Sequence, residues 1–318
     1  MRHFLAIALL VPLLAWGQAF PTKVVKINIP FSASSGPAVF LQVLAEKLSK
    51  AWGERVIIEP KPGASGFIAI EGVKNAAPDG HELLIVSNSH VAINPALYKK
   101  LPYDPERDFV PVSLVYRTPY FVAVAAAGPY QAIPALIAAA KANPGKLSYG
   151  VAFIGSPPHL GGALFGFLTG TEMTAVPFKE QNQLYVALAT GDLAWALSTV
   201  GSALPLMKAG RVKLIAIASP SRSPAYPEIP TVEEAGGPAG LQVDSWLALM
   251  APRGTPPPLI ARINADVAKQ MSDADVVQRL RVLGFEAAPD TPEQLARLIR
   301  EETKKYGELV RRVGASAD

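Results

Sequence analysis

Cysteine is absent from this chain of 318 residues, and histidine occurs only four times. Without thiols the protein has no disulfides, no thiolate metal ligands and no cysteine nucleophile. Three histidines, His81, His90 and His159, follow the N-terminal segment, and no two of them have a spacing typical of a metal site. We therefore expect a protein that uses neither a metal nor a cofactor.

Motifs of common enzyme classes are also missing. Gly63-Ala64-Ser65-Gly66 has the wrong spacing for the nucleophile elbow G-x-S-x-G, and no phosphate-binding G-x-x-x-x-G-K-[ST] loop occurs. The acidic pairs Glu233-Glu234 and Glu301-Glu302 lie in segments that we expect to be solvated, without a partner to shift their pKa values. The sequence thus indicates a binding protein rather than an enzyme; a hydrolase of unfamiliar type is the alternative.

Basic runs and aromatic-basic stripes are missing as well. The formal charge is +4, and lysine and arginine are scattered along the chain, so we expect no nucleic-acid partner. A modest positive field can still draw an anionic ligand to the protein.

The one apolar run whose length suggests a signal peptide or a membrane anchor is at the N-terminus. Arg2 and His3 precede the apolar stretch Phe4–Trp16, and Gly17-Gln18-Ala19 supplies the small residues that a signal peptidase reads. This stretch is short for a membrane-spanning helix. We therefore predict a signal peptide over residues 1–19, cleaved after Ala19, and a periplasmic mature protein.

The most informative feature that is present is a repeated pattern. Val24–Leu48 and Lys146–Leu168 each read as a short apolar strand, a loop of small residues, a proline and an amphipathic helix. Pro37 and Pro157 suit the first turn of these helices. A helix start leaves backbone N–H groups unpaired and carries partial positive charge, which favours an anion. Two such starts facing one cleft would bind a small molecule with a carboxylate at one or both ends.

Strands and helices alternate along the mature chain, which predicts an α/β fold with largely parallel sheets. The length after the leader suits two domains. We place domain 1 at residues 20–120 and 246–318 and domain 2 at residues 121–245, joined by two crossing strands that act as a hinge. The expected strands include 24–29, 55–59, 81–86, 120–127, 174–177, 194–199, 212–218 and 243–250, and the expected helices 37–52, 133–141 and 184–190. Thr291 and Gln294 predict the start of a C-terminal helix.

The chain resembles a known family, the Bug-type extracytoplasmic solute receptors of tripartite tricarboxylate transporters. The resemblance covers nearly the whole mature chain and depends on the order of several segments: INIPFSASSG, EPKPGASGFIA, APDGHELLIVSNSHVAINPALYKKLPYDPERDF, GSPPHL, VPFKE, SALPLMKAGRVKLIAI, SPAYPEIPTVEEAG, SWLALMAPRGTPP and TPEQLARLI. It implies a two-domain periplasmic binding protein of type II (a Venus flytrap). It also implies a monomer that closes on a carboxylated solute and delivers it to membrane permease subunits.

The sequence departs from the family pattern at four expected cleft positions. Ala38 replaces an acidic residue, which disfavours an amino-acid ligand, and Phe67 stands where relatives often have Asn. Ser198-Thr199-Val200-Gly201 replaces a segment with an Asp-Asn pair, and Phe178-Lys179-Glu180 replaces Tyr-Lys-Gly. We therefore expect an unusual ligand.

Candidate ligand contacts follow from the repeated pattern and the resemblance together. Polar and glycine candidates come from the two helix starts, from a strand end and from the departures. Four aromatic residues are expected around the cleft and predict an apolar wall. The candidates are Phe31, Ser32, Ser34, Ser35, Gly36, Phe67, Ser87, Asn88, Ser89, Gly155, Ser156, His159, Phe178, Ser198 and Trp246. A capping role for the serines and a core position for the aromatic residues are the alternatives.

The function expected from the sequence is capture of a di- or tricarboxylate, or of an aromatic carboxylate, for transport. A periplasmic sensor that signals to a membrane partner would use the same binding chemistry, so this alternative stays open.

Overall fold

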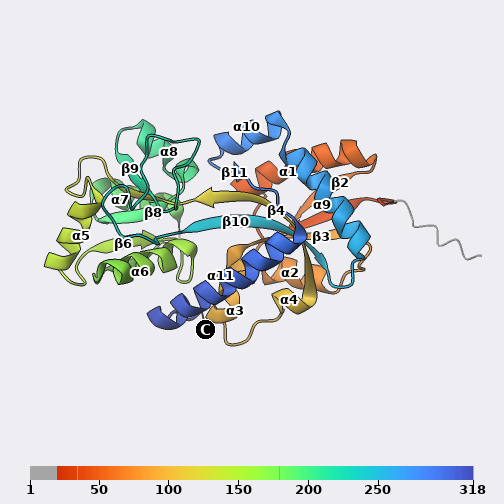
Figure 1. Ribbon diagram of the computed structural model, residues 1–318, viewed down its shortest axis with the longest axis horizontal. Helices are drawn as coiled ribbons and strands as arrows, with labels where there is room; N and C mark the ends of the chain where they lie inside the picture. The colour runs from red at the N-terminus through yellow and green to blue at the C-terminus, as the bar shows by residue number, and fades with distance from the viewer. Residues whose placement is uncertain (1–19, 34, 179, 318) are drawn as a thin grey trace, which may run out of the picture.

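The structure is a computed structural model that describes residues 20–317 except residues 34 and 179. The predicted signal peptide and the candidate residue Ser34 lie outside this part of the chain. Two α/β units, each built on its own sheet, lie side by side along the long axis of the molecule (Figure 1).

The first sheet has six strands in the order β11-β4-β10-β3-β1-β2. Their bounds are β1 Val25–Ile29, β2 Val56–Pro60, β3 Glu82–Ser87, β4 Phe109–Pro119, β10 Asp244–Pro252 and β11 Glu286–Ala287. Helices cover both faces. One face packs against α1 Gly36–Trp52, α9 Pro257–Met271 and α10 Ala274–Val282, and the other against α2 Phe67–Lys74 and α11 Pro292–Val313.

Short helices connect the strands of this unit. They are η1 Ala64–Gly66, η2 Ser89–Ile93, α3 Asn94–Leu97 and α4 Pro105–Asp108. The helix η2 begins two residues after the last residue of β3, so the polar residues of this segment lie at the end of a central strand.

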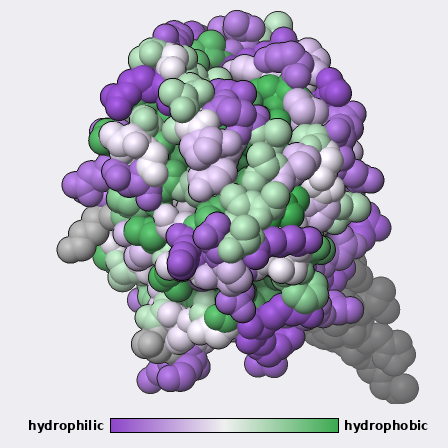
Figure 2. Space-filling view, turned by 90° about the vertical axis from the view of Figure 1, so that its left-hand side faces the viewer, coloured by the Kyte–Doolittle hydropathy of each residue, from purple (hydrophilic) through white to green (hydrophobic). Residues whose placement is uncertain are grey.

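The second sheet has five strands in the order β7-β6-β8-β5-β9. Their bounds are β5 Phe121–Ala125, β6 Ser148–Val151, β7 Thr174–Pro177, β8 Trp195–Ser198 and β9 Val212–Ile217. The helices α5 Ile133–Ala142 and α6 Pro157–Thr169 cover one face, and α7 Gln181–Thr190 and α8 Val200–Lys208 cover the other. Figure 2 faces this end of the molecule and shows hydrophilic and hydrophobic residues interspersed over its surface.

Both sheets are mixed, which corrects the expectation of largely parallel sheets. The pairs β1–β2, β1–β3, β6–β7 and β6–β8 are parallel. However, β10 runs antiparallel to β3 and β4, and β5 runs antiparallel to β8 and β9. Both β5 and β10 enter their sheets from the other unit, and they make most of the antiparallel pairs; β11, which is reached within the first unit, also runs antiparallel to β4.

The two units are connected by the paired strands β4 and β10, which cross the middle of Figure 1. Asp244 pairs with Pro119 at the crossing, and the Tyr120 N–H donates to the Val243 carbonyl over 3.3 Å. From β4 the chain continues into β5 of the second unit, and from the segment 219–243 it returns through β10 to the first unit. The exact domain boundaries stay a prediction, but this strand pair is what a two-strand hinge requires.

The C-terminal helix α11 contacts both units. It begins with the predicted capping box of Thr291 and Gln294 and runs along the first sheet. Its last turns bring Tyr306 and Val310 into one apolar cluster with Leu160 of α6. Glu302 on this helix is 7% exposed, so the expectation that the Glu301–Glu302 pair is solvated was wrong for its second member.

Among the described residues, no helix combines the length and the apolar character that crossing a membrane requires.

Candidate ligand-binding cleft

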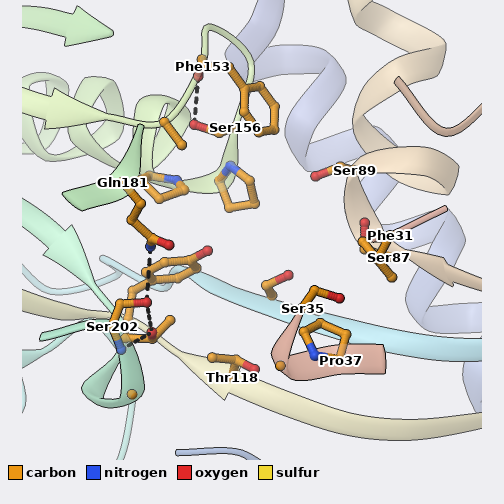
Figure 3. Close-up of a pocket in the computed structure, with 18 of the residues that line it drawn as sticks. Phe31, Ser35, Pro37, Ser87, Ser89, Thr118, Phe153, Ser156, Gln181 and Ser202 are labelled. Atoms are coloured by element: carbon orange, nitrogen blue, oxygen red, sulfur yellow. Dashed lines mark hydrogen bonds between the residues drawn. The ribbon is translucent and has the colours of Figure 1, made fainter. Parts of the chain in front are cut away.

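A cavity of about 1050 Å³ lies between the two units, beside the hinge strands. Residues from both sheets line it: β-strand ends and the start of α1 on one side, and the starts of α6, α7 and α8 on the other. Figure 3 shows these side chains facing one another across the gap. Four helices thus begin at a single cavity, which concentrates the positive ends of their dipoles there.

The start of α1 lies at the cavity, and Ser35 caps this helix. The Ser35 Oγ accepts the Ala38 N–H over 3.3 Å and donates to the Ser32 carbonyl over 2.7 Å. Gly36 and Pro37 line the cavity, and the Gly36 N–H is one of the first-turn groups without an intrahelical acceptor. This helix start can donate a backbone hydrogen bond to an anion.

The start of α6 lines the same cavity but has no comparable donor. Its first two residues, Pro157 and Pro158, have no backbone N–H. The Gly155 N–H donates to His159 Nδ1 over 3.0 Å, and the His159 N–H donates to Ser156 Oγ over 3.4 Å. The expected second set of amide donors is therefore used internally or missing.

Ser156 is the one candidate at this helix start whose side chain lines the cavity. Its Oγ donates to the Phe153 carbonyl over 2.7 Å, and its own N–H donates to the same carbonyl over 3.2 Å (Figure 3). Gly155 and His159 are buried behind it, and burial lowers the pKa of His159. The Gly155 backbone has a φ of +86°, which explains the glycine by conformation rather than by ligand contact.

Two further helix starts at the cavity were not among the candidates. Gln181 begins α7, and Thr199 caps α8 by accepting the Ser202 N–H over 3.3 Å. The Gln181 side-chain amide and the Thr199 hydroxyl both donate to Ser202 Oγ, over 3.0 and 2.9 Å (Figure 3). The departures from the family pattern at positions 178–180 and 198–201 lie next to these two helix starts in the sequence. They are the sequence signal that could have added the two helix starts to the candidates.

The end of β3 places the candidates Ser87 and Ser89 in the cavity lining. The Ser87 N–H donates to His90 Nδ1 over 3.0 Å. Burial lowers the pKa of His90 to about 4, so this imidazole is neutral at physiological pH and fixes the loop.

Three candidates, two polar and one aromatic, are buried for structural reasons and do not line the cavity. Asn88 is fully buried, and its Nδ2 donates to the Asp244 carbonyl over 3.0 Å, which braces the hinge. Trp246 Nε1 donates to Glu302 Oε2 over 2.9 Å, which fixes α11 to the same strand. The Ser198 hydroxyl donates to the carbonyl of the next residue over 2.9 Å.

Phe67, Phe178 and Ser32 also lie outside the cavity lining. The Phe67 ring makes edge contacts with Tyr98 and Tyr103, and Phe178 packs on the apolar cluster under α7. Ser32 is exposed, and its carbonyl accepts hydrogen bonds within the loop. Of the aromatic candidates, Phe31 lines the cavity.

The apolar wall is instead built by residues that the sequence did not single out. Phe285 stacks on Tyr116, with ring centroids 4.3 Å apart and planes within 3°, and both rings line the cavity. Phe153 lines the opposite side and is 55% exposed. These residues come from three distant segments, so only folding brings them together.

No aspartate, glutamate, lysine or arginine is among the described residues that line the cavity. The described lining therefore offers a ligand neutral hydrogen-bond donors, helix dipoles and apolar contacts. Groups of His, Asp or Glu able to hold a metal ion are not found in the described part of the chain either.

Comparison with known proteins places this geometry in context. A family model described as "Tripartite tricarboxylate transporter family receptor" matches residues 40–315. A protein of the tcbD–tcbE intergenic region of Pseudomonas sp. strain P51 is 33% identical over 293 residues, which cover 92% of this chain and 87% of that protein.

Solved structures agree over the same extent. Rpa4515 of R. palustris, solved with adipate, has a TM-score of 0.81 and 30% identity and covers 93% of this chain and 99% of its own. MatC of Rhodopseudomonas palustris, solved with malate, has a TM-score of 0.75 and 31% identity and covers 92% and 100%. Both neighbours hold a small carboxylate.

Proposed function

Because the chain belongs to the tripartite tricarboxylate transporter receptor family, we propose that it is an exported, monomeric receptor that captures a small organic acid and delivers it to a membrane transporter. The leader at residues 1–19 would direct it to the periplasm, where other family members act. The acid would bind in the interdomain cavity, with a carboxylate at the start of α1.

The observation that carries this proposal is the convergence of four helix starts on one cavity, whose described lining includes no acidic residue, lysine or arginine. A carboxylate gains from the helix dipoles and from the Gly36 amide, which has no acceptor within its own helix, while the ligand's remaining surface contacts neutral and apolar groups. The ligand-bound neighbours support a carboxylate as the ligand class.

Closure of the two units on a ligand gives the receptor a conformation that a transporter can distinguish from the open one. Residues from both units line the cavity, so a bound acid makes its full set of contacts only when the units are together. A ligand shifts this equilibrium by its difference in affinity between the closed and open states.

The test uses the mature protein and a panel of organic acids of two to ten carbons. A ligand that binds the native state raises the apparent melting temperature by mass action, and calorimetry then gives its Kd. Gly36→Pro should weaken binding of the best acid by roughly tenfold to a hundredfold, the value of one hydrogen bond to a charged group.

Ala274→Pro is the matched control. It also places proline at the first position of a helix, α10, on an exposed residue away from the cavity. Unchanged affinity in Gly36→Pro, or no acid that binds at all, would reject the proposed function.

A further inference from the structure

We propose that the ligand carries a single carboxylate, at the start of α1, and a neutral hydrogen-bonding group at its far end. This inference rests on the proposed function and specifies which acids fit. It follows from what occupies each helix start in the second unit.

The start of α6 cannot take a second carboxylate. Pro157 and Pro158 carry no N–H, and the amides of Gly155 and His159 donate within the protein. The surface at this helix start consists of the Pro157 and Pro158 rings, the Phe153 ring and the Ser156 hydroxyl, whose hydrogen is donated to the Phe153 carbonyl. That surface suits the apolar body of a ligand.

The start of α8 is covered by another part of the backbone. The Leu283 carbonyl oxygen lies 2.7 Å from the place where a Cβ of residue 201 would stand. This oxygen is the negative end of a peptide dipole and stands at the first turn of α8, where an anion would otherwise bind. A second carboxylate there would face a carbonyl oxygen instead of open N–H groups.

An acidic side chain of the protein already stands at the start of α7. Glu180 is the N-cap residue of this helix, its side chain makes no capping hydrogen bond, and it is exposed. Its charge complements the helix dipole and repels a second anion. With no cationic side chain in the described cavity lining, a far carboxylate has no counter-charge in this part of the protein.

The polar groups that remain match a neutral partner. Ser202 Oγ accepts from both Gln181 Nε2 and Thr199 Oγ1, and its own hydrogen can turn either to the Tyr185 hydroxyl beside it or to a ligand. The Gln181 amide oxygen is an acceptor beside it. A carboxamide or hydroxyl both donates and accepts, whereas a carboxylate only accepts, so the neutral group satisfies this pair better.

The experiment compares acids of equal size. Adipate is matched with its monoamide, and terephthalate with 4-carbamoylbenzoate, and each Kd is measured by calorimetry at pH 7.5. We expect each monoamide to bind at least tenfold more tightly than its dicarboxylate. In Ser202→Ala the monoamide should lose about tenfold in affinity and the dicarboxylate less than twofold.

Ser272→Ala is the matched control, since it removes an exposed hydroxyl that donates to the Ala268 carbonyl on α9. Melting curves without ligand establish that each variant is folded. Equal or tighter binding of the dicarboxylates by the wild-type protein overturns the inference but leaves the proposed function intact. If Lys179→Gln then abolishes that preference, Lys179, which lies outside the described residues, supplies the missing charge. Failure of every acid to bind rejects the proposed function itself.

Discussion

Replacing Glu302 with glutamine should remove a pH dependence of stability that arises at the hinge. Glu302 is 7% exposed, and its Oε2 accepts the Trp246 Nε1–H over 2.9 Å. Burial, with a smaller contribution from Asp244 on the hinge strand, raises the pKa of Glu302 to about 7. Lys305 on the same helix and Arg117 on β4 oppose this rise.

The sign follows from proton linkage. In the unfolded chain a glutamate titrates near its ordinary value of about 4.3, so between that pH and 7 the folded state binds the extra proton. The folded state is therefore favoured by acid, and the contribution of Glu302 is lost as the pH rises through this window. Between pH 5 and pH 7.5 the loss amounts to about 2 kcal/mol.

Glutamine keeps a carbonyl acceptor for the Trp246 indole and does not titrate. We expect the stability of Glu302→Gln, relative to the wild-type protein, to be about 2 kcal/mol higher at pH 7.5 than at pH 5. Urea denaturation at the two pH values measures this difference. Other titrating groups, such as His90, are present in both proteins, so their contributions cancel.

Glu308→Gln is the control, because it changes an exposed residue of the same helix. It should give the same difference from the wild-type protein at both pH values. If Glu302→Gln shows no pH-dependent difference, then the Glu302 carboxyl is charged throughout this range and the argument from burial fails.

Three further outcomes are expected. The pKa of His90 in the folded protein is about 4, below its unfolded value of about 6.5, so the stability that neutral His90 contributes is lost as the pH falls. Urea titrations should therefore show that the stability advantage of the wild-type protein over His90→Gln shrinks by about 2 kcal/mol from pH 7 to pH 5. Gly162→Ala should destabilise the protein by about 1–3 kcal/mol, because a Cβ there would overlap the buried ring of Tyr149; a melting temperature unchanged within error would contradict this. Ser223→Ala removes a hydrogen bond of 2.6 Å to Glu286 across the two units, so small-angle scattering should show a more open free protein, and an identical profile would speak against a role in closure.

Local sequence signals predicted the elements well. The helix expected from Pro37 to Trp52 is Gly36–Trp52, with Ser35 as its cap and Gly53 in the left-handed conformation at its end. The capping box at Thr291 and Gln294 is present as predicted. These outcomes depend on residues within one or two turns of each other, so the sequence could specify them directly.

The cavity was predicted only in part. Ser35, Gly36 and Ser156 lie at their helix starts and line it, because a helix start fixes the direction of its first residues. Trp246 and Phe67 could not be assigned to core or cleft from the sequence, since each has an apolar ring on a suitable segment. Their partners, Glu302 for one and Tyr98 for the other, lie far away in the chain.

The sequence alone shows the α/β pattern, the repeated strand–loop–helix unit and the absence of thiol chemistry, and it alone is the basis of the predicted export signal. The tertiary structure alone decided which helix starts can receive an anion. Whether a helix start is open depends on the groups that surround it in space: the Leu283 carbonyl of the first unit covers the first turn of α8 in the second unit. Hydrogen-bond partners separated by long stretches of chain are set by packing, and no local pattern records them.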